Sequence, residues 1–284
     1  MIKVIEQTVV GKKSQETCED GVFAGKNKVA VIDGSTSKSD IHFDKDVSNG
    51  RLAMTIIKQQ LAEVETMPLE GVIQHLQDRL FEQYTIYQNI HGQQIILPKD
   101  RLSASMAIYD DDAAELWLIG DCQALVDGEY FDNPKPMEST HAERRALHIR
   151  QLFRTGTSVD KMQCNDSGRA LVLQDIIRDM SGQNNPKSPV AYAALDGFPI
   201  CWEKVKKLSL DPSVRHEIVL ASDGYPRLKP TLEQSEQALK RQLTEDPLCV
   251  STFLATKGLM KGQQSFDDRA YIRFETSRKD RTTK

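Results

Sequence analysis

The chain has 284 residues, of which 39% are hydrophobic and 27% are charged, and its formal net charge is -4. These values are ordinary for a globular protein, and the acidic balance argues against a nucleic-acid or anionic-membrane surface. No apolar run approaches the ~20 residues that span a bilayer, and residues 1–6 alternate like a strand without a signal-peptide core. The sequence therefore predicts a soluble protein with no nucleic-acid and no membrane partner.

The cysteines indicate the compartment. Five cysteines are scattered along the chain, and no two of them form a C-x-x-C pair. An odd, scattered set is typical of reduced thiols rather than of a disulfide framework or a zinc site. We therefore expect a cytoplasmic protein.

The first part of the chain predicts strands and then a helix pair. Short strand-like runs cover residues 3–9 and 28–32. Two helical patterns follow, with one apolar stripe over 52–64 and a second over 72–87. A Met-Pro pair at 67–68 separates them, which suggests that the two helices run antiparallel.

The middle of the chain predicts three strands and two helices. The β-like runs lie at 104–109, 115–119 and 123–126, and the turn residues between them are typical of a meander. Helical patterns then cover 141–153 and 169–180. Two histidines of the first helix, at positions 141 and 148, are interpreted as surface residues.

The last part predicts strands at 206–210, 216–221 and 270–274. A helix begins at Thr231, whose capping-box spacing to Gln234 marks its first turn, and another helix is expected around 249–257.

Strands grouped in hairpins and helices grouped in pairs favour an α+β layered domain over a doubly wound parallel sheet. No linker or internal repeat divides the chain. We expect one domain over 1–276 and a polar tail over 277–284, with a monomer as the favoured oligomeric state.

Acidic residues stand at the ends of apolar runs. Asp33-Gly34 and Asp223-Gly224 each end a strand-like run, and Asp267-Asp268 precede another. Each pair alone also reads as an ordinary turn or a surface acidic pair. Gathered together, such carboxylates would repel one another unless a cation lay between them, and hard divalent ions bind through oxygen.

Six short motifs follow one another along the chain. They are Glu19-Asp20, Val31-Ile32-Asp33-Gly34, Ser103-Ala104-Ser105, Gly120-Asp121-Cys122-Gln123, Leu220-Ala221-Ser222-Asp223-Gly224 and Asp267-Asp268. In this order they resemble the type 2C metal-dependent serine/threonine protein phosphatases (the PPM family), as a divergent, bacterial-like member. The resemblance covers the chain from about Gly11 to Phe274.

This resemblance implies a four-layer αββα sandwich, in which two central, mostly antiparallel β-sheets are flanked by helix pairs. It also implies a phosphomonoester hydrolase with a phosphoprotein substrate. A two-metal centre of Mn²⁺ or Mg²⁺, with room for a third and looser ion, would activate water for direct attack on phosphorus.

The resemblance also assigns the catalytic metal ligands. Asp33 would bridge both ions, and the carbonyl of Gly34 would ligate one of them. Asp223 and Asp267 would complete the shell of the other ion. These three aspartates are the candidate catalytic residues.

Four further acidic positions follow from the same resemblance. Glu19 and Asp20 would act at the entry side, through direct or water-mediated contacts. Asp121 would help to hold the third ion, and Asp268 could assist at that site.

The chain departs from the family pattern at the phosphate-binding position. Many members carry an arginine there, whereas this chain has Gln15, which suggests a high KM for simple phosphoesters. Lys12, Lys13 or a residue of the 35–46 loop could supply the missing charge. Ser35 stands where animal members often have a histidine, so the proton for the leaving group must come from water or from another residue.

Two alternatives remain beside the phosphatase interpretation. One is a catalytically weak, phosphatase-like regulatory or binding module. The other is a two-metal hydrolase of a small phosphoester.

Overall fold

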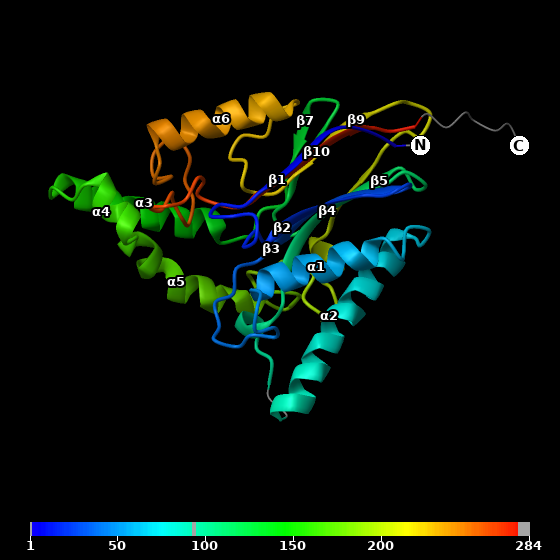
Figure 1. Ribbon diagram of the computed structural model, residues 1–284, viewed down its shortest axis with the longest axis horizontal. Coiled ribbons are helices and arrows are strands. Elements are labelled where there is room, and N and C mark those ends of the chain that lie inside the picture. Colours follow the sequence, from blue (N-terminus) through cyan, green and yellow to red (C-terminus); the bar gives the residue numbers. More distant parts are fainter. Residues whose placement is uncertain (1, 93–94, 278–284) are drawn as a thin grey trace, which may run out of the picture.

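Two five-stranded sheets form the centre of the molecule in the computed structural model, which describes residues 2–92 and 95–277 (Figure 1). The first, here the β1 sheet, has the order β1-β10-β9-β6-β7, and the second, the β2 sheet, has the order β2-β3-β4-β5-β8. Every hydrogen-bonded strand pair in the two sheets is antiparallel.

The β1 sheet contains β1 (Lys3–Val10), β6 (Gln123–Val126), β7 (Glu129–Phe131), β9 (Glu217–Ala221) and β10 (Arg269–Glu275). The β2 sheet contains β2 (Asp20–Ala24), β3 (Lys28–Gly34), β4 (Ala104–Asp110), β5 (Glu115–Ile119) and β8 (Lys206–Ser209).

Successive side chains of a strand point to opposite faces, and those on the inner faces form the core between the sheets. Val29 and Val31 of β3 pack in one cluster with Leu220 of β9 and Ile272 of β10. Ala30 and Ile32 belong to a second cluster, on the opposite face of the sheet. A β-strand turns successive side chains to opposite faces, so an apolar run such as β3 is buried on both.

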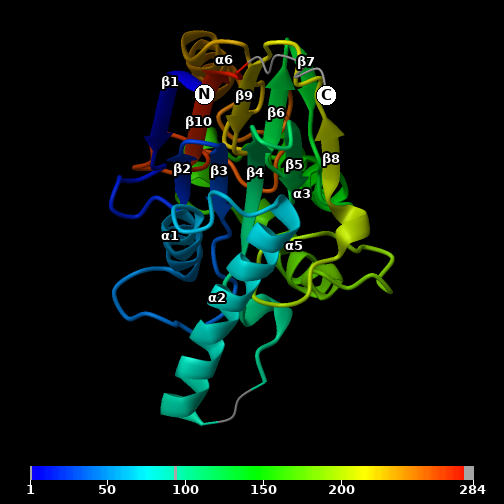
Figure 2. The same cartoon turned by 90° about the vertical axis from the view of Figure 1, so that its right-hand side faces the viewer.

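Two helices cover the outer face of the β2 sheet (Figure 2). They are α1 (Asn49–Leu61) and α2 (Leu69–His91), as the two apolar stripes predicted. The side chain of Ser48 caps α1 by accepting a hydrogen bond from the backbone N–H of Arg51.

The remaining helices cover the β1 sheet and one end of the sandwich. Leu239 of α6 (Leu232–Glu245) packs with Val219 and Tyr271 on the outer face of the β1 sheet. The other three helices are α3 (Glu138–Arg154), α4 (Val159–Cys164) and α5 (Ser167–Asp179), and Figure 1 shows them together to one side of the sheets. The predicted α+β, four-layer αββα class is confirmed. Short 3-10 turns complete the described elements, at Pro98–Asp100, Met180–Gly182 and Trp202–Lys204.

The predicted meander is wrong at its third strand. β4 and β5 pair as expected, but β6 pairs with β9 and β7 in the other sheet. The chain leaves the β2 sheet at Gly120, whose φ of 72° is a left-handed conformation that glycine adopts without strain. The turn residues Gly120 and Asp121 therefore connect a strand of one sheet to a strand of the other, and they do not form a hairpin.

The helix predicted around 249–257 is also wrong. Cys249 has a φ of 53°, which does not continue a right-handed helix. The Asp246 carboxylate accepts hydrogen bonds from the backbone N–H groups of Val250, Ser251 and Thr252. Side-chain bonds of this kind compete with helix formation, and the segment is a loop. The helix from Thr231 is confirmed, since its side chain caps α6 through a 3.3 Å bond from the Gln234 N–H.

The predicted tail over 277–284 lies outside the described residues except for Ser277, so the domain boundary stays a prediction. Across the described residues, none of the helices combines the length and the apolar character needed to cross a bilayer.

Candidate metal centre

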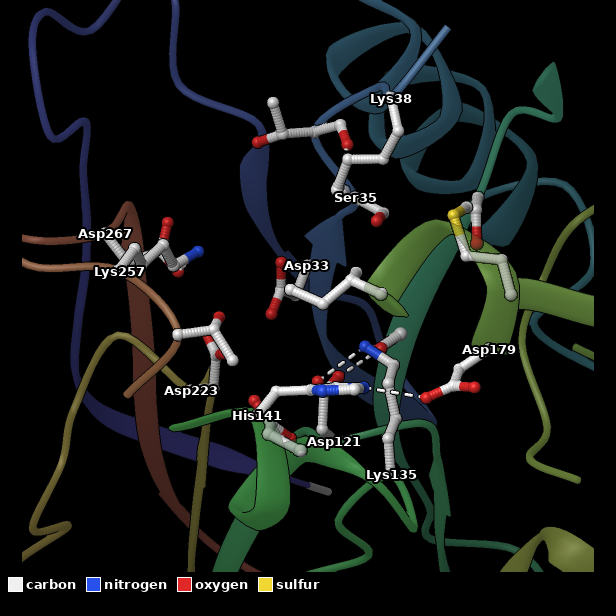
Figure 3. A pocket seen from close by; sticks show the side chains of 18 of the residues that line it. Asp33, Ser35, Lys38, Asp121, Lys135, His141, Asp179, Asp223, Lys257 and Asp267 are labelled. Atoms are coloured by element: carbon white, nitrogen blue, oxygen red, sulfur yellow. Dashed lines mark hydrogen bonds and ion pairs between the residues drawn. The ribbon is translucent and has the colours of Figure 1, made fainter. Parts of the chain in front are cut away.

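A cavity of about 450 Å³ lies where strand ends of the two sheets meet α3 and α5 (Figure 3). Six of the aspartates that line it come from distant parts of the sequence: Asp20, Asp33, Asp121, Asp223, Asp267 and Asp268. Asp20 begins β2, Asp33 lies opposite it in the register of β3, and Asp223 closely follows β9. The antiparallel order brings these ends together, so carboxylates far apart in sequence share one cavity.

The glycines of the two Asp-Gly pairs allow close approach of the backbone. A Cβ atom on Gly34 would lie 2.2 Å from the carbonyl oxygen of Gly50, and one on Gly224 would lie 2.0 Å from that of Asp268. A larger residue at position 34 would clash with the start of α1, and one at position 224 would clash with the residue before β10. The glycines thus allow close packing of the backbone directly after Asp33 and Asp223.

Burial and mutual repulsion dominate the centre of the acidic cluster. Burial and the charges of Asp20 and Asp223 raise the pKa of Asp33 well above its ordinary value. Burial and the charge of Asp267 likewise raise the pKa of Asp20, and they raise that of Asp223 to about 8. Each of these carboxylates would be stabilised in its charged form by a cation.

Lysines neutralise the edge of the cluster. Lys257 and Lys12 both form ion pairs with Asp267, and Lys12 Nζ also lies 3.3 Å from Asp268. Burial alone would raise the pKa of Asp267, but these two lysines lower it to about 2. Asp121 is held in the same way, because Lys135 Nζ lies 2.6 Å from its carboxylate and Ser105 donates to its other oxygen. These two pairs lower the pKa of Asp121 against the effect of its burial.

One close group of ligand atoms was not predicted in full. Asp121, Glu138 and Asp223 each offer a carboxylate oxygen within 4.8 Å of the others. Glu138 lies in the first turn of α3, and burial together with the Asp121 charge raises its pKa. Among the residues that the structure describes, Asp33 and Asp267 do not belong to such a tight group.

The residues fit a hard divalent cation. Asp20 is buried, and its Oδ2 atom has no hydrogen-bond partner within the described part of the chain. A buried carboxylate oxygen without a partner is costly, and a metal ion would satisfy it. The acidic donors of the cluster are carboxylates, which suit Mg²⁺ and Mn²⁺.

The other predicted ligands lie around this cluster in different ways. The Glu19 carboxylate accepts hydrogen bonds from Thr36 and, at 2.6 Å, from Ser48, and it is not among the residues that line the cavity. Asp268 accepts bonds from the backbone N–H groups of Lys12 and Glu19, at 2.7 and 3.2 Å. Gly34 lines the cavity, and ligation by its carbonyl stays a prediction, as does ligation by Glu19.

The surface interpretation of His141 is wrong. Only 5% of this residue is exposed, and it lines the cavity on α3. Its Nε2 atom lies 2.7 Å from Asp179 Oδ2, at the last residue of α5 (Figure 3). The polar composition of α3 suggested that this histidine faces solvent, but packing of α3 against α5 buries it.

The residues at and near the position of the missing arginine differ in whether they line the cavity. Gln15 and Lys13 are exposed and do not line the cavity, whereas Lys12 does. Lys38 also lines the cavity, and it belongs to the 35–46 loop that was named as a possible source of the missing charge. Sequence reasoning missed four other charged lining residues, which lie on loops or helix starts where no motif marks them: Lys135, Glu138, Arg169 and Lys257.

No protein-family model matches the chain, and no curated protein matches it. Solved structures similar to it include RsbX in complex with magnesium, at 14% identity over 98% of this chain and 100% of that one, with a TM-score of 0.45. The serine/threonine phosphatase PstP of Mycobacterium tuberculosis is 13% identical over 98% and 100%, with a TM-score of 0.47. The PPM Ser-Thr phosphatase MsPP from Mycobacterium smegmatis, in complex with cacodylate, is 13% identical over 97% and 100%, with a TM-score of 0.46.

Proposed function

We propose that this chain is a metal-dependent phosphomonoester hydrolase that acts on phosphoserine or phosphothreonine in proteins. The observation that carries the proposal is one cavity in which a buried aspartate cluster faces five lysine and arginine side chains. Carboxylates of this kind hold divalent cations, and cationic side chains bind phosphate. The two together match the needs of phosphate-ester hydrolysis.

Two tight Mn²⁺ or Mg²⁺ sites would be held by Asp20, Asp33, Asp223 and Asp267, with the carbonyl of Gly34. A third and looser ion would lie at Asp121, where Glu138 adds an oxygen. When bound, these ions would lower the pKa of water and neutralise charge on the phosphoryl oxygens.

The chain's own side chains prepare the site for this chemistry. Lys12 and Lys257 keep Asp267 ionised, which is the form that binds metal. Asp20, Asp267 and Asp268 are buried, so their charges interact more strongly than charges at the surface. Apolar residues of α5, Leu173 and Ile176, line the same cavity and offer a surface for a peptide.

We propose that the protein is cytoplasmic and monomeric. Its substrate would be a phosphoprotein. All five cysteines are free thiols, and Cys18, Cys122, Cys201 and Cys249 are buried. Free thiols of this kind suit a reducing compartment.

Hydrolysis of a phosphopeptide and of p-nitrophenyl phosphate, measured with Mn²⁺, Mg²⁺ or EDTA, tests the proposal. We expect turnover with either metal, none with EDTA, and none for Asp33→Asn. Asp40→Asn is the matched control, because Asp40 is exposed in the loop after β3 and does not line the cavity. Full turnover of Asp33→Asn under saturating Mn²⁺ would contradict the two-metal assignment. A preference for nucleotides over phosphopeptides would favour a small-phosphoester hydrolase.

A second candidate is a phosphatase-like binding module. The ion pair of Lys257 with Asp267 favours it, because an ammonium group already neutralises a predicted metal ligand. Calorimetry separates the two candidates. The module would bind phosphopeptide without Mn²⁺ binding and without turnover, whereas the enzyme binds Mn²⁺ at the aspartate cluster.

A further inference from the structure

Two of the five lysine and arginine side chains in the cavity differ from the others in their ion pairing. Lys12, Lys135 and Lys257 each form ion pairs with aspartates of the cluster. Lys38 and Arg169 also line the cavity, but neither has a carboxylate within 4.0 Å in the part of the chain that the structure describes. Their positive charges are therefore not balanced by a direct ion pair.

Both side chains are held by backbone contacts. Lys38 Nζ donates to the carbonyl of Thr36, in the loop between β3 and α1. Arg169 Nη1 donates to the carbonyl of Thr256 at 3.2 Å. The Arg169 backbone is fixed as well, because its N–H donates at 2.7 Å to Asp166, the N-cap of α5. Each contact leaves further N–H donors on the cationic group.

The charges around Lys38 are mainly positive. Burial, followed by the charges of Arg169, Lys257 and Lys135, lowers the pKa of Lys38 to about 7. Burial also lowers the pKa of Arg169; the charge of Asp166 acts against this effect, and the charge of Arg145 adds to it. Like charges held together at a partly buried site repel one another, and a bound anion relieves that repulsion.

We propose that Lys38 and Arg169 bind the phosphoryl group of the substrate and the inorganic phosphate product, in place of the arginine that Gln15 replaces. The proposal rests on the proposed function and assigns the phosphate-binding residues of the same cavity. A guanidinium can contact two phosphate oxygens at once, and an ammonium adds a point charge. Gln15 is exposed outside the cavity and offers neither.

The two residues come from different elements of the cavity lining. Lys38 belongs to the loop that follows Asp33, and Arg169 belongs to the first turn of α5. A phosphate between them would connect the strand-end loop to the helical region. The same phosphate would face the aspartate cluster, where the metal ions are expected.

The test uses Lys38→Met, Arg169→Met and the double variant, with two matched controls. Lys45→Met changes an exposed lysine of the same loop, and Arg178→Met changes an exposed arginine of the same helix. Neither control residue lines the cavity. The measurements are KM and kcat for p-nitrophenyl phosphate, the inhibition constant of inorganic phosphate, and the Mn²⁺ affinity by calorimetry.

We expect each single variant to raise KM and the phosphate inhibition constant about 10- to 150-fold, the range for one charged hydrogen bond. The Mn²⁺ affinity and the kcat should change less, and both controls should match the wild type. Arg169→Lys should recover part of the loss, because it restores the charge without the two-point contact. Gln15→Arg should leave KM unchanged.

Unchanged phosphate inhibition in the double variant, with normal Mn²⁺ binding, would overturn the proposal. So would a fall in KM for Gln15→Arg. If the wild type shows no turnover at all, the proposed function fails, and direct titration of the protein with inorganic phosphate then decides this proposal. Binding that the double variant loses supports it, and binding that the double variant keeps overturns it.

Discussion

Asp33 and Asp267 show how neighbours drive one residue type toward opposite charge states. Asp33 is surrounded by carboxylates, and its pKa is raised by burial and by Asp20. Asp267 is equally acidic in isolation, but ion pairs with Lys257 and Lys12 lower its pKa to about 2. Sequence motifs identified both aspartates as candidate ligands, but the motifs did not include the lysines that distinguish them. A charge partner from a distant loop leaves no local pattern.

Asp121→Ala should weaken hydrolysis while leaving the two tight metal sites in place. Asp121 shares its carboxylate with Lys135 and Ser105, so few of its lone pairs remain for a metal ion. An ion held by few carboxylates binds loosely. Calorimetry with Mn²⁺ checks the result, and Ser105→Ala is the control that removes one hydrogen bond and no charge. Loss of a high-affinity site in Asp121→Ala would contradict this assignment.

Asp223 should make the metal-free protein less stable as the pH rises. Its folded-state pKa is raised to about 8 by burial and by Asp267, whereas an unfolded aspartate titrates near 3.9. Its contribution to stability is fully present below the unfolded value and is lost as the pH rises through the folded value. Asp223→Asn removes the ionisable group and with it this pH dependence. The Tm of the variant minus the Tm of the wild type should therefore grow between pH 5 and pH 9. A constant difference over that range, measured in EDTA, would contradict the shifted pKa.

At the scale of elements, one buried arginine joins α3, α5 and the loop after α6. Arg145 is fully buried, and its Nε and Nη2 atoms donate to Asp166 Oδ2 at 3.0 and 2.7 Å. Its Nη1 donates to the carbonyls of Leu248 and Ala255 at 2.8 and 2.9 Å. Because Asp166 also caps α5, this network fixes the start of the helix that carries Arg169.

Arg145→Ala should destabilise the protein by about 3–5 kcal/mol, since it leaves Asp166 buried without its partner. Denaturation in urea measures this change. The neighbouring Arg144→Ala is the control, because Arg144 pairs with Asp175 at the surface and its loss should change the free energy of unfolding little. Similar costs for the two variants would show that the buried network has no special role.

The sequence predicted the positions of most elements well, including the four-residue strands β6 and β8, but it did not predict every strand pairing. The stripes of α1 and α2 and the runs of β4 and β5 have enough residues to show their periods. β7 has three residues, too few for a pattern, and β2, which begins at Asp20, was not predicted as a strand. The sheet that contains β6 depends on tertiary pairing with β9, which local sequence does not encode.

At the scale of the whole molecule, the β-sandwich brings motifs that are far apart in the sequence together in one site. Asp20, Asp33, Asp223 and Asp267 lie at strand ends on one side of two different sheets, and the core between the sheets holds those ends in place. Motif order identified these carboxylates. The opposite wall of the cavity, from α3 and α5, carries no motif and could be found only from the fold.

Mn²⁺ should therefore stabilise the whole fold, because an ion that binds the native cluster has no equivalent site in the unfolded chain. Mass action gives about 2.7 kcal/mol at a free ion concentration of 100 times Kd, or roughly 5–10 °C in Tm for a chain of this size. Asp33→Asn should start from a higher metal-free Tm, since it removes a charge from the repelling cluster, and it should gain less from Mn²⁺. Asp40→Asn, outside the cavity, should behave as the wild type. Thermal unfolding of the three proteins across a Mn²⁺ titration measures both effects, and a wild-type Tm that is the same in EDTA and in saturating Mn²⁺ would rule out a metal centre at this end of the sandwich.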